Sequence, residues 1–101
     1  MKLVLRSRLA HADIESALDH LAAAPHVAGD FLDALEKAVT HIQRGPGTGS
    51  PRHAHELDIP GLRFWLLRKF PYAVFYLERD DHLLMLRLVH MSRDIPASFQ
   101  G

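Results

Sequence analysis

The chain has 101 residues, and its 12 Lys and Arg balance its 12 Asp and Glu, so its formal net charge at pH 7 is zero. This length predicts one small domain, residues 1–101, with a single core and no room for a separate cofactor domain. The lack of cysteine excludes disulfides, thiolate metal sites and a cysteine nucleophile. With no apolar run of about 18 residues and no signal peptide, we expect a cytoplasmic protein that does not span a membrane.

The charges are unevenly distributed along the chain. Residues 1–62 hold six Lys and Arg against eight Asp and Glu, whereas residues 63–101 hold six against four. The C-terminal part is therefore the more basic one and is suited to an anionic partner. The imbalance is still far from that of a dedicated nucleic-acid-binding protein.

The first half of the chain predicts one strand and two helices. Residues 2–6 form a short apolar run bounded by charge, which is typical of an edge strand. Residues 9–24 carry an apolar stripe at helical spacing, and Pro25 is expected to end that helix. Residues 27–44 repeat the pattern, and Gly45 is expected to cap them in a left-handed conformation. The short connection predicts an antiparallel helix hairpin.

Residues 45–61 form a long loop rich in Gly, Pro and His. His53 and His55 are two residues apart and could face the same way in an extended segment. Zinc normally takes three or four protein ligands, and the sequence shows no third ligand nearby. We therefore expect no metal and no cofactor.

The region from Leu62 to His90 predicts three antiparallel strands at 62–69, 72–79 and 82–90, because its hydrophobic period falls to two. Pro71 and the pair Asp80-Asp81 mark the two turns. The expected class is α+β, with an N-terminal strand, an antiparallel helix hairpin and a three-stranded antiparallel meander.

Strict alternation along these strands predicts where the side chains point. It places Arg63 and Lys69 on one face of the first meander strand and Arg68 on the other. In the last strand it places Arg87 with Met85 and Val89, and His90 with Leu86 and Leu88. A single face that gathers all the basic side chains is therefore not assured.

In this order, the elements and several motifs resemble the RelE/ParE superfamily of toxins from bacterial type II toxin–antitoxin systems. The most specific stretches are 61–65 (GLRFW), 69–76 (KFPYAVFY) and 88–94 (LVHMSRD), and 12–14 (ADI) is similar to the ParE branch. The resemblance covers nearly the whole chain. It implies a helix hairpin packed on a twisted sheet of about four strands.

The resemblance also implies a cognate antitoxin that wraps the toxin with a helical or extended C-terminal segment. The chain would then be a homodimer or part of a toxin–antitoxin hetero-oligomer. We expect the antitoxin to contact apolar side chains of the helices and the first meander strand: Ile14, Leu18, Phe31, Leu35 and Trp65.

The two branches of the superfamily imply different activities. ParE-like toxins inhibit DNA gyrase by binding, which is our leading expectation and needs no catalysis. We expect the target to be bound by Arg63, Lys69, Arg87, His90 and Arg93. A RelE-like toxin would be an endonuclease that cuts messenger RNA on the ribosome, with the catalytic set Arg63, Arg68, Lys69, Arg87 and His90. A third interpretation is a non-toxic interaction module or a decayed toxin.

Structural roles compete with each functional one. Arg63 could pair with Asp58 or Glu56, which would fasten the loop to the strand. Arg93 and Asp94 could fix the turn of the tail, and His90 could be a structural histidine at a strand end. The aromatic residues Trp65, Tyr72 and Tyr76 are better explained by packing than by base stacking.

Overall fold

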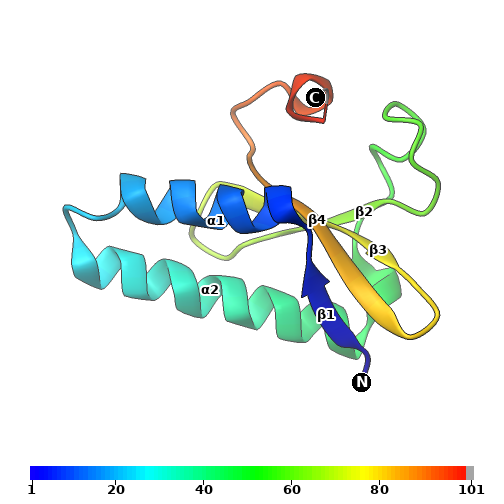
Figure 1. The fold of residues 1–101 in the computed structure, drawn as a ribbon, viewed down its shortest axis with the longest axis horizontal. Coiled ribbons are helices and arrows are strands. Elements are labelled where there is room, and N and C mark those ends of the chain that lie inside the picture. The colour runs from blue at the N-terminus through cyan, green and yellow to red at the C-terminus, as the bar shows by residue number, and fades with distance from the viewer. Residues whose placement is uncertain (100–101) are drawn as a thin grey trace.

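A computed structural model describes residues 1–99 of the chain. It has the α+β order expected from the sequence, with one strand, a helix hairpin and then three strands (Figure 1). The elements are β1 (Leu3–Arg6), α1 (Arg8–His20), α2 (Pro25–Arg44), the 3₁₀ turn η1 (Pro46–Thr48), β2 (Arg63–Leu66), β3 (Tyr72–Glu78), β4 (His82–His90) and α3 (Ile95–Ser98). In the described part, no helix combines the length and hydrophobicity needed to cross a membrane.

The four strands form one mixed sheet in the order β1-β4-β3-β2. The pairs β2–β3 and β3–β4 are antiparallel, which confirms the predicted meander. β1 lies at the edge, as expected, and runs parallel to β4 with Leu3 opposite His82. The first strand of the chain therefore depends on the last one for its backbone hydrogen bonds.

The two helices cover one face of the sheet. α1 and α2 run antiparallel in Figure 1, and their apolar stripes form the larger core with strand residues such as Val74 and Met85. α1 begins where the Ser7 hydroxyl accepts a hydrogen bond from the Ala10 N–H at 3.0 Å, which caps the helix.

Three details of the helix ends differ from the predictions. α1 ends at His20 rather than at residue 24. Contrary to the prediction, Pro25 does not end α1 but is the first residue of α2, a position where its missing N–H costs nothing. Gly45 has φ −146° and ψ 80°, so the left-handed cap was a wrong prediction.

The other face of the sheet is covered by irregular chain. The segment 49–62 and α3 lie on the far side of the strands from α2 (Figure 1). Their apolar side chains, including Leu62 and Ile95, pack with Phe75 and Val89 in a second core. β3 is buried on both sides, because Ala73, Phe75 and Leu77 join this second core while Val74 and Tyr76 join the first. Burial on both faces explains why β3 reads as a continuous apolar run.

A β-bulge in β4 overturns the predicted alternation there. The register passes from Phe75 opposite Arg87 to Tyr76 opposite Met85, so Leu86 is the extra residue. As a result Met85 and Leu88 both lie in the helix-facing core, and Leu86 and Val89 both lie in the second core. Arg87 therefore does not share one face with both Met85 and Val89, and Leu86 does not share a face with Leu88.

Candidate target-binding surface

The structure gathers four of the predicted basic residues at one end of the sheet. Tyr72, the first residue of β3, lies opposite His90, the last residue of β4, and the Met91 N–H donates to the Pro71 carbonyl at 2.8 Å. The β2–β3 turn and the segment after β4 therefore lie side by side. We call the group that they carry the basic sheet end: Arg68, Lys69, His90 and Arg93.

Arg68 and Lys69 lie in the turn, because β2 ends at Leu66 and does not reach residue 69 as predicted. The strand alternation that separated the two side chains therefore does not apply. Both residues are exposed, and Lys69 has the left-handed φ of 68°. Phe70 anchors the turn with its ring edge-on to Phe31, 5.5 Å between centroids.

A shallow hollow of about 410 Å³ separates this turn from α2. The turn contributes Arg68 and Lys69, and the helix contributes Asp30 and Asp33. The acids lie beside the cations, so the positive potential is strongest on the outer side of the turn. The hollow itself is too open and too mixed in charge to define a small-molecule pocket.

His90 is held at the strand end by its own turn. Its Nδ1 accepts the Ser92 N–H at 3.1 Å and lies 2.7 Å from the Ser92 hydroxyl. In the neutral ring the proton is then on Nε2. The ring packs edge-on against Tyr72 at 5.0 Å. These contacts give His90 the structural role at a strand end that competes with the catalytic one.

Arg93 is exposed in the turn between β4 and α3. The tail turn is fixed by Asp94 instead, whose Oδ1 accepts the Ala97 N–H at 3.3 Å as the cap of α3. Asp94 also accepts the Ser98 hydroxyl on its carbonyl at 3.0 Å. The Arg93 side chain is therefore not needed to hold this turn.

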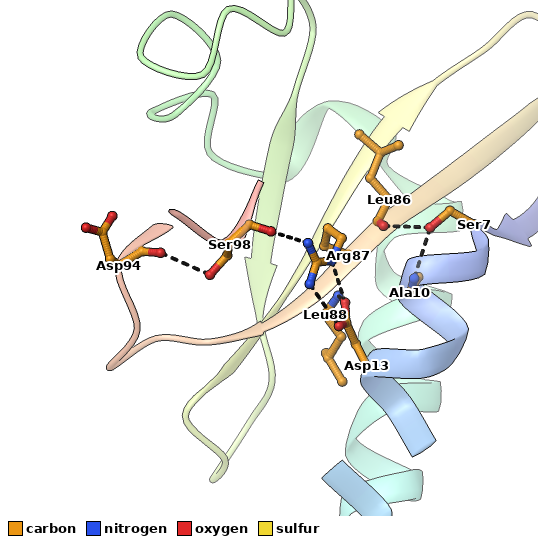
Figure 2. A network of polar contacts seen from close by, with 8 residues as sticks. All are labelled: Ser7, Ala10, Asp13, Leu86, Arg87, Leu88, Asp94 and Ser98. Carbon is orange, nitrogen blue, oxygen red and sulfur yellow. Dashed lines mark hydrogen bonds and ion pairs between the residues drawn. The ribbon is translucent and has the colours of Figure 1, made fainter. Parts of the chain in front are cut away.

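Arg87 lies inside a polar network with Asp13 and Ser98 (Figure 2). Its Nε and Nη2 donate to the two Asp13 carboxylate oxygens at 2.7 and 3.0 Å, and Nη1 donates to the Ser98 carbonyl. Asp13 also accepts the Leu88 N–H at 3.0 Å. The hydrogen bonds that Arg87 donates to Asp13 raise the pKa of the guanidinium above its ordinary value. The network joins α1, β4 and the tail, so this arginine is committed to the fold.

Arg63 is also committed to the fold, at the opposite end of β2. Its Nη1 donates to the Gly49 carbonyl at 2.8 Å. The predicted pairing with Asp58 or Glu56 is therefore replaced by a contact with a carbonyl group. The Tyr76 hydroxyl completes the anchor, because it accepts the Gly49 N–H at 3.0 Å and donates to the Pro46 carbonyl at 2.7 Å.

Burial raises the pKa of Tyr76, an effect that outweighs the hydrogen bond from Gly49. A Cβ at Gly49 would collide with the Tyr76 hydroxyl, so the close approach of the two residues requires glycine. Sequence reasoning missed both this anchor and Asp13. The position of Asp13 on the α1 side facing β4 emerges only once the helix and strand are packed together.

The apolar residues expected to bind the antitoxin are mainly core residues. Ile14, Phe31 and Leu35 are buried in the helix-facing core, so they are removed from any surface that a partner could contact. Leu18 and Trp65 are partly buried against that core, and Trp65 stacks on His41 with 4.0 Å between ring centroids. The large exposed hydrophobic side chains lie elsewhere, at Met1, Leu3, Leu5, Leu9, Leu32 and Leu66.

The loop histidines do not converge. His53 packs against the stacked rings of Phe64 and Phe75 and lies 3.5 Å from Glu56, whereas His55 is exposed. Within residues 1–99, no cluster of three or more His, Asp or Glu side chains could hold a metal ion.

Comparison with known proteins identifies the family of this chain and a solved structure with the same fold. The sequence model described as "ParE toxin of type II toxin-antitoxin system, parDE" matches residues 4–95, and the chain belongs to that family. This confirms the resemblance to the ParE branch. A solved structure titled "Chromosomal ParDE TA system from P. aeruginosa" superposes with a TM-score of 0.73, over 89% of this chain and 96% of that one. At 22% sequence identity, that match establishes the shared fold. No curated protein sequence matches this chain significantly.

Proposed function

We propose that this ParE-type toxin inhibits bacterial growth in the cytoplasm by binding DNA gyrase through the basic sheet end. A cognate antitoxin neutralises it by binding elsewhere on the surface. Family membership supports the class of protein, and the gyrase target follows from the resemblance to the ParE branch. The chain acts as a binding protein and needs neither a cofactor nor a metal.

The observation that favours binding over catalysis is that the residues of the RelE-type catalytic set lie apart from one another. RNA cleavage needs a base, an acid and cations around one phosphate. Here Arg63 is hydrogen-bonded to Gly49 at one end of β2, and Arg87 is enclosed by Asp13 and Ser98. His90 lies with Arg68 and Lys69 at the other end of the sheet. The five side chains occupy three separate places and leave no common phosphate site.

The basic sheet end suits binding better. Arg68, Lys69 and Arg93 are exposed, and within residues 1–99 none of the three forms an ion pair or a side-chain hydrogen bond. Unpaired cations in the turns at this end of the sheet can contact an acidic protein surface without first breaking an internal contact. The ring of Phe70 and the backbone hydrogen bond from Met91 to Pro71 hold the backbone that carries these side chains.

The test is controlled expression in a bacterium, together with gyrase supercoiling by the purified chain. We expect growth arrest, filamentation, intact messages and inhibition of supercoiling. The triple variant R68E/K69E/R93E should lose inhibition at least about tenfold, a loss of about 1.4 kcal/mol of binding free energy. The matched control is R52E, another exposed arginine, which lies in the loop covering the second core.

Two other outcomes would overturn the proposal. New cuts within translated codons, mapped by primer extension, would establish the RelE-type nuclease. Normal growth with confirmed folded protein would indicate a non-toxic interaction module or a decayed toxin.

A further inference from the structure

Leu66 is a large apolar side chain that the fold leaves exposed to solvent. It is the last residue of β2, it is 51% exposed and it belongs to neither core. Leu66 lies opposite Ala73 of β3, and Ala73 lies opposite Val89 of β4. Paired residues of neighbouring strands point to the same face of the sheet, so all three lie on the face of the second core. Ala73 and Val89 are buried there, whereas the cover ends before it reaches Leu66.

The segment that covers the second core leaves the end of β2 free. Ser50 pairs with the outer side of β2 at Phe64, through backbone hydrogen bonds of 2.9 and 3.0 Å. In this antiparallel pair the residues before Ser50 would run toward Leu66, but the chain turns away at Gly49, whose N–H donates to the Tyr76 hydroxyl. Within residues 1–99, no other segment pairs with the outer side of β2. The path of the loop therefore leaves Leu66 exposed where β2 leads into the basic sheet end.

Leu66 is not an isolated apolar residue on this surface. Pro71, two residues before Ala73, is exposed, and its carbonyl accepts the Met91 N–H at 2.8 Å. Met91 is partly buried against the second core, so it lies on the same face of the sheet as Leu66. We call Leu66, Pro71 and Met91 the apolar patch. The patch extends the second core as far as the turns that carry the basic sheet end.

The basic sheet end borders the apolar patch. Arg68 follows Leu66 by two residues, and Arg93 follows Met91 by two. The acids of the hollow belong to α2, which covers the opposite face of the sheet. An apolar centre with arginine at its rim is typical of a protein–protein interface. A phosphate backbone would use the cations alone and gain little from a leucine, so the combination favours a protein surface with an apolar pocket bounded by carboxylates.

We propose that Leu66 is the apolar anchor of the target-binding surface. It enters an apolar pocket on the target protein, and the Asp and Glu side chains around that pocket pair with Arg68, Lys69 and Arg93. Burial of the leucine adds affinity that cations at a solvated rim do not supply. A second copy of this chain fits less well, since a symmetric contact would bring the same cations of both copies together. The inference rests on the proposed function, because it takes the basic sheet end as the target-binding surface.

The experiment measures the affinity of the full chain for purified gyrase without DNA, and separately for a DNA duplex, by isothermal titration calorimetry. L66A should weaken binding to gyrase about tenfold, because it removes most of one buried leucine side chain from the interface. L66K should also weaken binding, because it places an ammonium group in an apolar pocket.

L9A and L9K are the matched controls, because Leu9 is 56% exposed and lies just after β1, at the opposite edge of the sheet. Both should bind as the unmodified chain does, and circular dichroism establishes that each variant is folded.

Two outcomes would overturn this inference and leave the proposed function in place. Gyrase binding that R68E/K69E/R93E weakens, but that L66A and L66K leave unchanged, would confine the contact to the cations. Binding to duplex DNA as tight as binding to gyrase, and strengthened by L66K, would assign the patch and its cations to a nucleic acid. No binding of the unmodified chain to gyrase would overturn the proposed function and this inference with it.

Discussion

The two faces of the sheet are covered in different ways. On one face, α1 and α2 bury regular apolar stripes, with hydrogen bonds that each helix makes within itself. On the other face, the segment 49–62 and α3 bury a smaller set of side chains with little regular structure. That irregular cover is held by two polar anchors, Arg63–Gly49–Tyr76 and Asp13–Arg87–Ser98. A loop and a tail can thus close a core, provided that a few side chains replace the missing helical hydrogen bonds.

The largest expected effect tests whether the irregular cover packs as tightly as the helical one. Phe31 on the helix side and Phe75 on the loop side are both fully buried. We expect Phe31→Ala and Phe75→Ala each to lower the free energy of unfolding by about 3–5 kcal/mol. Urea denaturation measures the loss, with Leu32→Ala as the exposed control. A cost below about 1 kcal/mol for Phe75→Ala alone would show that the second core is loosely packed.

The next effect concerns the anchor of the tail. Asp13 and Arg87 are only 16% and 17% exposed, and the pair is bidentate. Removing one partner leaves a poorly solvated charge, so Asp13→Ala should cost about 2–4 kcal/mol. A double-mutant cycle with Arg87→Ala should give a coupling energy of about 1–3 kcal/mol. Hydrogen exchange should accelerate in α3 more than in α2, and equal acceleration in both would contradict the role of the pair as a tail anchor.

A smaller effect, with a defined pH dependence, is expected at the other anchor. Tyr76→Phe removes two hydrogen bonds and should cost about 1–2 kcal/mol at neutral pH. Because burial raises the pKa of Tyr76, the unfolded chain loses this proton more readily than the folded chain. The contribution of the Tyr76 hydroxyl to the free energy of unfolding should therefore be fully present below about pH 10 and be lost as the pH rises further.

Absorbance of tyrosinate during an alkaline titration measures this difference, with Tyr72→Phe as the control. Tyr76→Phe should remove part of the decline in stability above pH 10. An unchanged decline would assign it to other groups.

The smallest effect lies outside both covers, in the β3–β4 turn. The pKa of Asp81 is lowered by its hydrogen bond with His82, 2.7 Å away. A carboxyl group of this kind contributes stability above its ordinary pKa of about 3.8, and the contribution is lost as the pH falls below that value. Solvent screens this exposed pair, so Asp81→Asn should leave the urea midpoint at pH 7 unchanged. A clear shift of the urea midpoint would show that the Asp81–His82 pair contributes to stability at neutral pH despite its exposure.

The hydrophobic periodicity of the sequence predicted the helical cover far better than the irregular one. The stripes of Phe31 and Leu35 are visible in the sequence because a helix repeats every 3.6 residues, and so is the meander, because its strands alternate. The bulge at Leu86 is not visible in the hydrophobic pattern. This one inserted residue reversed the predicted faces of the β4 residues that precede it. The early end of β2 was equally hidden, and it moved Arg68 and Lys69 from a strand into a turn.

The positions of the candidate residues were predicted only in part for a related reason. Lys69, His90 and Arg93 were expected to act together and do lie at one end of the sheet. Arg63 and Arg87 were expected to join them, but each is held by a partner distant in sequence. Such pairings arise from tertiary packing, and no spacing rule within the sequence reveals them.

The parallel pairing of β1 with β4 also affects how the protein is made. The Ser7 hydroxyl donates to the Leu86 carbonyl across a separation of 79 residues, and β1 has no other strand to pair with among residues 1–99 (Figure 1). Synthesis proceeds from the N-terminus at about 5–20 residues per second, so β1 emerges seconds before its partner. Closing so long a loop also slows folding. The nascent chain therefore cannot complete its sheet before β4 has been synthesised, and a fragment that stops before β4 leaves β1 without a partner strand.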